Sequence, residues 1–125
     1  MIFGIGTDLV AIKRLSDMWQ RHGDRALEKL LAQEERNDCR ASVAPGRFLA
    51  KRFAAKEALG KALGTGIRSP VLLTNISVMH DSLGKPGFAY ASELDDWLRA
   101  RGLVAHLSVS DESEYAQAFV VVEKI

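Results

Sequence analysis

The segment Arg47–Leu63 constrains the fold more than any other part of the chain. It is rich in Ala, Leu and Lys, it follows Pro45-Gly46, and its one interruption is Gly60. Ala, Leu and Lys are strong helix formers, and a Pro-Gly pair is a common helix-start signal. We therefore predict a long helix that ends at Gly64-Thr65-Gly66.

Five other segments have the residue pattern of β-strands. In residues 2–12, Phe3, Ile5, Thr7 and Leu9 fall on one face, whereas Gly4, Gly6 and Asp8 fall on the other. Successive side chains of a strand point to opposite faces, so this alternation predicts a strand. The remaining strands are predicted over 74–80, 86–90, 104–110 and 115–123. The last two should form a terminal antiparallel hairpin around residues 111–114.

Shorter helices are predicted elsewhere in the chain. From Lys13 to Arg40 the apolar residues recur at helical spacing, with a break at Gly23. Ser92 is a suitable cap for a helix that runs to Arg101. Helices and strands are mixed without a regular βαβ repeat, so the fold class is expected to be α+β. We find no internal repeat or linker, and we expect a single domain over residues 1–125.

Charge and cysteine content bound the functional classes. The formal net charge is only +1, which argues against a general nucleic-acid binder. Cys39 is the single cysteine, so no disulfide can form within the chain, and no Cys or His lies near it at the spacing of zinc ligands. A free thiol of this kind is compatible with a reducing compartment. No signal peptide is evident, and no apolar run is long enough to cross a bilayer. We therefore expect a cytoplasmic protein that does not act at membranes.

Asp8 is the first candidate for chemistry. A carboxylate is disfavoured within a strand of apolar and small residues, and it is costly if buried alone. Gly4 and Gly6 share its face, which suggests that a ligand approaches the bare strand there while Asp8 supplies an oxygen to a cation. The simpler alternative is an aspartate in a turn at the strand end.

Glu57 is the second candidate. On the long helix it falls in one stripe with Ala50, Phe53, Ala54 and Lys61, which resembles an interface more than a solvated face. The simpler alternative is an ordinary surface ion pair from Glu57 to Lys61, four residues further on.

Several other polar residues allow two interpretations. Lys51, Arg52, Lys56 and Lys61 lie on different sides of the helix, so some of them are expected to meet phosphates rather than water. His106 shares a polar strand face with Ser108 and Ser110, which alone indicates no more than a solvated sheet face. Gly64 and Gly66 suit a helix C-cap and turn. A basic patch that could receive an acidic protein includes Arg14, Arg21 and Arg25.

Six blocks of the sequence together resemble the holo-acyl-carrier-protein synthases, which belong to the 4'-phosphopantetheinyl transferase family. The blocks are Gly4–Val10, Arg47–Ala58, Lys61–Ile67, Leu83–Pro86, His106–Asp111 and Tyr115–Ala116. They cover essentially the whole chain in the order found in that family. The resemblance implies a 4'-phosphopantetheinyl transferase-like fold, in which an antiparallel sheet packs against a long central helix. It also implies a Mg²⁺-dependent enzyme, usually a homotrimer with active sites between subunits, which serves fatty acid biosynthesis.

The resemblance also implies roles for individual residues. Asp8 and Glu57 match the magnesium ligands, and Lys61 matches the cation that holds the pyrophosphate of coenzyme A. Arg52 and His106 match positions that contact the nucleotide end of coenzyme A, including its 3'-phosphate, while Gly64 and Gly66 would line the pocket. The docking surface for apo-acyl carrier protein would include Arg14, Arg21 and Arg25.

Three other functions remain open at this point. A non-catalytic binding module would bind coenzyme A without turning it over. A metal-dependent phosphodiesterase would use the same acidic pair but would transfer to water. A purely structural interaction protein would bind neither Mg²⁺ nor nucleotide.

Overall fold

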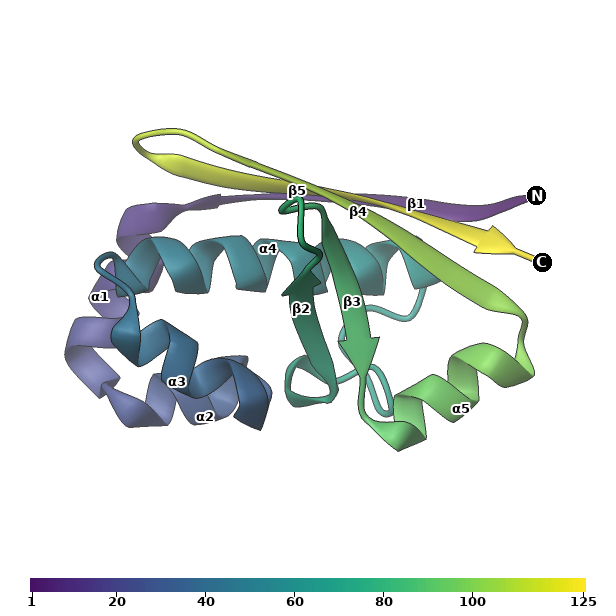
Figure 1. Ribbon diagram of the computed structural model, residues 1–125, viewed down its shortest axis with the longest axis horizontal. Coiled ribbons are helices and arrows are strands. Elements are labelled where there is room, and N and C mark those ends of the chain that lie inside the picture. The colour runs from purple at the N-terminus through teal and green to yellow at the C-terminus, as the bar shows by residue number, and fades with distance from the viewer.

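The computed structural model describes residues 1–125, and it has an α+β fold in which a long helix lies beneath an antiparallel sheet (Figure 1). The sheet has the order β1-β5-β4 and is formed by β1 (Ile2–Ala11), β5 (Tyr115–Lys124) and β4 (Leu103–Asp111). A separate two-stranded sheet pairs β2 (Ile76–His80) with β3 (Pro86–Tyr90). The predicted fold class and the packing of a sheet on a central helix are confirmed.

The helices follow the predicted segments closely. The central helix α4 runs over Pro45–Leu63, and Gly64 ends it in the left-handed conformation (φ 79°). The region before it forms three short helices: α1 (Ile12–His22), α2 (Asp24–Leu30) and α3 (Gln33–Ala41). They lie at one end of α4, whereas α5 (Ser92–Ala100) lies at the other (Figure 1).

Two predicted boundaries are wrong. Ser92 does not cap α5, because Ala91 occupies the N-cap position and Ser92 is the first helical residue. Acidic Glu93 and Asp95 lie in the first turn, where negative charge interacts favourably with the helix dipole. The strand predicted from Thr74 begins at Ile76, because Leu73–Asn75 form a single 3₁₀ turn, η1.

The glycines of β1 allow the strand to lie directly on α4. A Cβ atom added to Gly4 would lie 2.0 Å from the carbonyl oxygen of Ala62, and one added to Gly6 would lie 2.0 Å from that of Ala58. Since either contact is a severe clash, only glycine permits this approach. The expectation that a ligand occupies this bare face is therefore wrong, because the α4 backbone occupies it.

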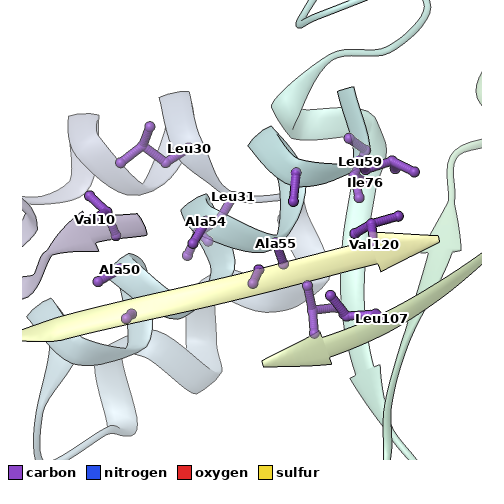
Figure 2. Packing of buried hydrophobic residues seen from close by; sticks show 14 of the residues in the cluster. Val10, Leu30, Leu31, Ala50, Ala54, Ala55, Leu59, Ile76, Leu107 and Val120 are labelled. Carbon is purple, nitrogen blue, oxygen red and sulfur yellow. The ribbon is translucent and has the colours of Figure 1, made fainter. Parts of the chain in front are cut away.

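The hydrophobic core lies between α4 and the inner face of the three-stranded sheet. Figure 2 shows Ala55 of α4 near Leu107 and Val120 of the sheet, whereas Leu59 lies beside Ile76 and Ala54 beside Leu31. Small alanines along the helix let the sheet come close, and the alternating residues of β5 point into the same core. No helix in this fold combines the length and the apolar character that a membrane crossing requires.

The core also contains one ion pair, between Lys56 of α4 and Glu35 of α3. The Lys56 side chain has no exposed surface, and its Nζ donates to Glu35 Oε1 at 2.6 Å and to the carbonyl oxygens of Leu30 and Leu73 at 3.0 Å each. Burial alone would raise the pKa of Glu35, but the Lys56 charge and the hydrogen bonds to the carboxylate hold it below the usual value. Lys56 is thus a structural residue rather than a phosphate contact.

We predict that Lys56→Ala lowers the free energy of unfolding by roughly 3–5 kcal/mol, because it removes the cation that binds Glu35 Oε1 in the core and leaves Arg52 as the only cation bound to this buried carboxylate. Lys13→Ala is the matched control: Lys13 forms an exposed ion pair with Asp17, so its loss should cost less than about 0.5 kcal/mol. Urea unfolding followed by circular dichroism, at one protein concentration, measures both. Equal effects of the two substitutions would contradict a structural role for the buried pair.

Candidate active site

Asp8 and Lys61 meet where β1 crosses α4. Lys61 Nζ lies 3.1 Å from Asp8 Oδ1 and donates to the carbonyl oxygen of Thr7 at 2.8 Å. Asp8 is paired with Ala118 in the sheet, so it lies inside the strand and not in a turn at the strand end. Its side chain is 17% exposed, which leaves the carboxylate at the rim of the crossing. The close contact between β1 and α4 therefore brings together an acidic and a basic residue that are far apart in the sequence.

Glu57 lies one turn before Lys61 on α4 and is half-buried, and it is close enough to Asp8 for the two charges to interact. Burial raises the pKa of Glu57, the nearby negative charge of Asp8 raises it further, and Lys61 and Arg14 oppose these effects. The surface pair between Glu57 and Lys61 is not formed, because the Lys61 ammonium bonds to Asp8 and Thr7. Two carboxylates thus share one site with two cations nearby.

The two carboxylates of Asp8 and Glu57 are suitable ligands for Mg²⁺. Mg²⁺ usually binds one or two protein carboxylates and completes its shell with water and substrate phosphates. No group of three or more His, Cys, Asp and Glu side chains in the chain could hold a metal ion. Asp8 and Glu57 are therefore compatible with a metal that substrate oxygens help to bind, and not with a closed structural metal site.

Gly64 and Gly66 follow Lys61 in an exposed loop. Both have positive φ angles, 79° and 63°, which favour glycine. The N–H of Gly66 donates to the carbonyl oxygen of Gly60 at 3.0 Å, and this bond folds the loop back onto α4. The structure thus brings the two glycines to the end of the helix that carries Glu57 and Lys61.

Arg52 lies on a different side of α4 from Glu57. Five residues separate the two positions, which corresponds to about 140° around the helix axis. Arg52 Nη1 donates to Glu35 Oε2 at 2.8 Å and to the carbonyl oxygen of Val78 at 2.6 Å. Sequence reasoning did not single out Glu35, because nothing in its own segment indicates that it pairs with residues 17 and 21 positions away.

His106 lies on the outer face of the three-stranded sheet. Its Nε2 is 2.6 Å from Glu123 Oε1, and both side chains are about half exposed. Leu107, the next residue of β4, is buried in the core, as the predicted alternation requires. Within one chain, therefore, the structure does not bring His106 to Asp8, whose side chain belongs to the inner face.

The predicted basic patch is formed by α1 and α2. Arg14 and Arg21 line a surface hollow of about 520 Å³. Arg25 lines a second hollow of about 460 Å³, and Met18 contributes to both. The guanidinium of Arg14 lies 5.5 Å from the centre of the Phe53 ring, one turn of α4 before Glu57. The patch is thus continuous with the Glu57 side of the acidic site.

The chain is similar to known proteins over nearly its whole length. The 4'-phosphopantetheinyl transferase superfamily matches residues 4–120. A holo-[acyl-carrier-protein] synthase of Dechloromonas aromatica is 57% identical over 123 residues, which are 98% of each chain. The crystal structure of the holo-[acyl-carrier-protein] synthase of Neisseria meningitidis has a TM-score of 0.95 at 46% identity, covering 99% of this chain and 100% of that one.

A third relative was crystallised with a ligand. The holo-(acyl-carrier-protein) synthase of Bacillus anthracis, solved in complex with CoA (3',5'-ADP), has a TM-score of 0.83 at 36% identity and covers 100% of this chain and 99% of its own. The predicted family resemblance is confirmed over nearly the full length. This chain therefore belongs to the 4'-phosphopantetheinyl transferase superfamily.

Proposed function

We propose that this chain is a holo-acyl-carrier-protein synthase. It transfers the 4'-phosphopantetheine group of coenzyme A to a serine of apo-acyl carrier protein and releases adenosine 3',5'-bisphosphate. The observation that carries this proposal is the pairing of Lys61 with Asp8 beside the half-buried Glu57. The names of the relatives and the ligand in the Bacillus anthracis complex support it.

The reaction breaks one bond of the pyrophosphate. The serine oxygen of the carrier bonds to the β-phosphorus, the bond from that phosphorus to the bridging oxygen breaks, and the bridging oxygen leaves with the nucleotide. The serine proton passes to an acceptor that we leave unassigned between Glu57 and a water molecule.

Lys61 has a free donor for the pyrophosphate. A lysine ammonium carries three N–H donors. Two of them are directed to Thr7 and Asp8, and these bonds hold the side chain in place. The third can bind a phosphate oxygen, and the positive charge stabilises the negative charge that develops on the leaving group. Gly64 and Gly66, at the end of the same helix, would line the pocket.

Asp8 and Glu57 would hold Mg²⁺, which when bound neutralises the charge of the pyrophosphate. The charge of Asp8 already raises the pKa of Glu57, so two carboxylates in this position favour a cation. The donor set is open, as a site shared with substrate oxygens requires.

We further propose that the active site is completed by a second chain in a homotrimer. Arg52, His106 and Lys61, which is paired with Asp8, lie on three different faces within one chain, yet the family resemblance assigns all three to coenzyme A. The outer face of the sheet carries large apolar side chains without a covering helix: Phe3, Ile5, Leu9, Val104, Tyr115 and Phe119. Exposed apolar patches of this kind mark association surfaces.

The basic patch of α1 and α2 would dock the acidic carrier. Arg14 links that surface to the active site, because it packs over Phe53 and affects the pKa of Glu57. Asp17, an acidic residue in the same hollow, is paired with Lys13 at 2.9 Å. A cytoplasmic location fits these substrates and the buried free thiol of Cys39, whose pKa burial raises to about 11.

We predict that the purified protein adds the mass of one phosphopantetheine to an apo-acyl carrier protein in the presence of coenzyme A and Mg²⁺. Asp8→Asn, Glu57→Gln and a chelator should each reduce the rate about 100-fold or more, the scale of losing one strong electrostatic group. Intact-mass spectrometry measures the product.

Glu93→Gln, a matched acidic change in the first turn of α5, removes a carboxylate that is not part of the proposed site and should leave the rate unchanged. Release of free phosphopantetheine without a carrier would instead support a phosphodiesterase. Binding of coenzyme A without any transfer would support a binding module.

We predict that Arg14→Glu raises the KM for the carrier about tenfold, equivalent to about 1.4 kcal/mol, because it places a negative charge against an acidic partner. The KM for coenzyme A should change little. Arg99→Glu reverses an exposed charge on α5, at the other end of the molecule, and serves as the control (Figure 1). An unchanged carrier KM for Arg14→Glu would reject this docking surface.

We predict that Phe119→Asp converts the protein to monomers and abolishes transfer. Phe119 lies in the middle strand and is paired with Thr7 and Ser108, so a charge there would be buried at the centre of the proposed interface. Val43→Asp changes a fully exposed loop residue and should leave the trimer intact. Sedimentation velocity distinguishes the species, and a trimeric Phe119→Asp protein would place the interface elsewhere.

A further inference from the structure

Arg52 stands between two cavities of opposite charge. The larger one, of about 690 Å³, is lined by the acidic residues Glu34, Glu35 and Asp38. The smaller one, of about 160 Å³, is lined by the basic residues Lys51 and His80 and by no acidic residue. Arg52 contributes to the walls of both, as do Val78 and His80, so its guanidinium can be held from the acidic side while it binds a ligand on the side of Lys51.

The acidic side holds Arg52 firmly. Glu35 Oε2 accepts the hydrogen bond from Arg52 Nη1 at 2.8 Å and another from the N–H of Val78 at 3.0 Å. The same Nη1 donates to the carbonyl oxygen of Val78 at 2.6 Å, and the guanidinium lies 4.4 Å from the centre of the Phe48 ring. With a carboxylate, a strand and an aromatic face around it, the side chain is restricted to one orientation.

Glu35 is itself fixed in the core. Its side chain is 2% exposed, and its other oxygen, Oε1, accepts hydrogen bonds from Lys56 Nζ at 2.6 Å and from the N–H of Ala32 at 2.9 Å. All four hydrogen bonds to this carboxylate come from different groups of the protein. Because these bonds fix the Glu35 carboxylate in the core, the Arg52 guanidinium that binds it is also held in one position.

The basic side leaves donors available. Arg52 Nε and Nη2 make no hydrogen bond within the chain, although a guanidinium has five N–H donors. Lys51 Nζ is 3.8 Å from Asp111 Oδ1, while Arg47 binds the other oxygen of Asp111 at 2.7 Å, so Lys51 is only loosely paired. A small cavity with two cations and a histidine suits one phosphate-sized anion.

We infer that Glu35 is a positioning residue, which orients Arg52 so that Nε and Nη2 bind the 3'-phosphate of coenzyme A in the basic cavity. The inference rests on the proposed function, since coenzyme A is the ligand there. The pyrophosphate is assigned to Lys61 on another face of α4, which leaves the 3'-phosphate as the remaining anionic group of this substrate. Glu35 does not touch the ligand and acts through Arg52.

The test compares coenzyme A with 3'-dephospho-coenzyme A as phosphopantetheine donors. For Glu35→Gln, the KM for coenzyme A should rise about tenfold, the scale of one charge-assisted hydrogen bond, whereas the KM for the dephospho donor and both kcat values should change little. Arg52→Ala should give the same selective loss, and the double variant no additional selective loss. Glu34→Gln is the matched control, since Glu34 accepts a hydrogen bond from Ser77 and does not contact Arg52.

Glu35→Gln also leaves Lys56 charged in the core, which destabilises the fold. A second variant therefore distinguishes an effect on folding from an effect on the orientation of Arg52. Glu35→Gln combined with Lys56→Met removes both charges of the buried pair, a change that is often tolerated, and should show the same selective loss. An equal rise in KM for both donors, or no rise for coenzyme A, would overturn the positioning role. Failure of the wild-type protein to transfer from either donor would instead reject the proposed function.

Discussion

The close contact between the backbones of β1 and α4 is the constraint on which the candidate site depends. Gly4 and Gly6 have no Cβ atoms, and any other residue at either position would collide with the carbonyl oxygens of Ala62 or Ala58. The strand therefore lies near enough for Lys61 Nζ to reach both Thr7 and Asp8. A separation larger by the size of a side chain would break these bonds. The two glycines therefore position Asp8 and Lys61 without taking part in the reaction.

A second contact fixes the other side of the same helix. Lys56 ties α4 to the end of α2, to Glu35 of α3 and to η1 through hydrogen bonds of 2.6–3.0 Å. Burying a charged pair brings little net stability in general, because desolvation offsets the attraction. Here the pair also sets the orientation of α3 on α4, because hydrogen bonds are directional and hydrophobic contacts are not. Lys56 and Glu57 are adjacent in sequence, so the anchor and the site share one turn of helix.

Much of the fold could be predicted because the relevant signals are local. The alternation in residues 2–12 put Asp8 on the same face as Gly4 and Gly6, and the structure has this arrangement. The same pattern could not tell whether a ligand or a helix fills the space over the glycines. Likewise, Lys56 and Lys61 look alike in the sequence, and what separates their roles is Glu35, which lies 21 residues from Lys56 along the chain. Pairings of this kind depend on tertiary packing, which local patterns do not contain.

The geometry of one helix is the reason why we propose that two chains complete the candidate site. Successive residues are about 100° apart around an α-helix, so Glu57 and Lys61 share a face, while Arg52 lies about 140° from Glu57. The sheet divides the remaining residues in the same way, since Asp8 belongs to its inner face and His106 to its outer face. No rotation of side chains can bring groups on opposite sides of a packed helix or sheet to one surface, where a single bound coenzyme A would contact them all. If all of them bind one coenzyme A molecule, as we propose, two chains must contribute, and each α4 then serves two sites through its two faces.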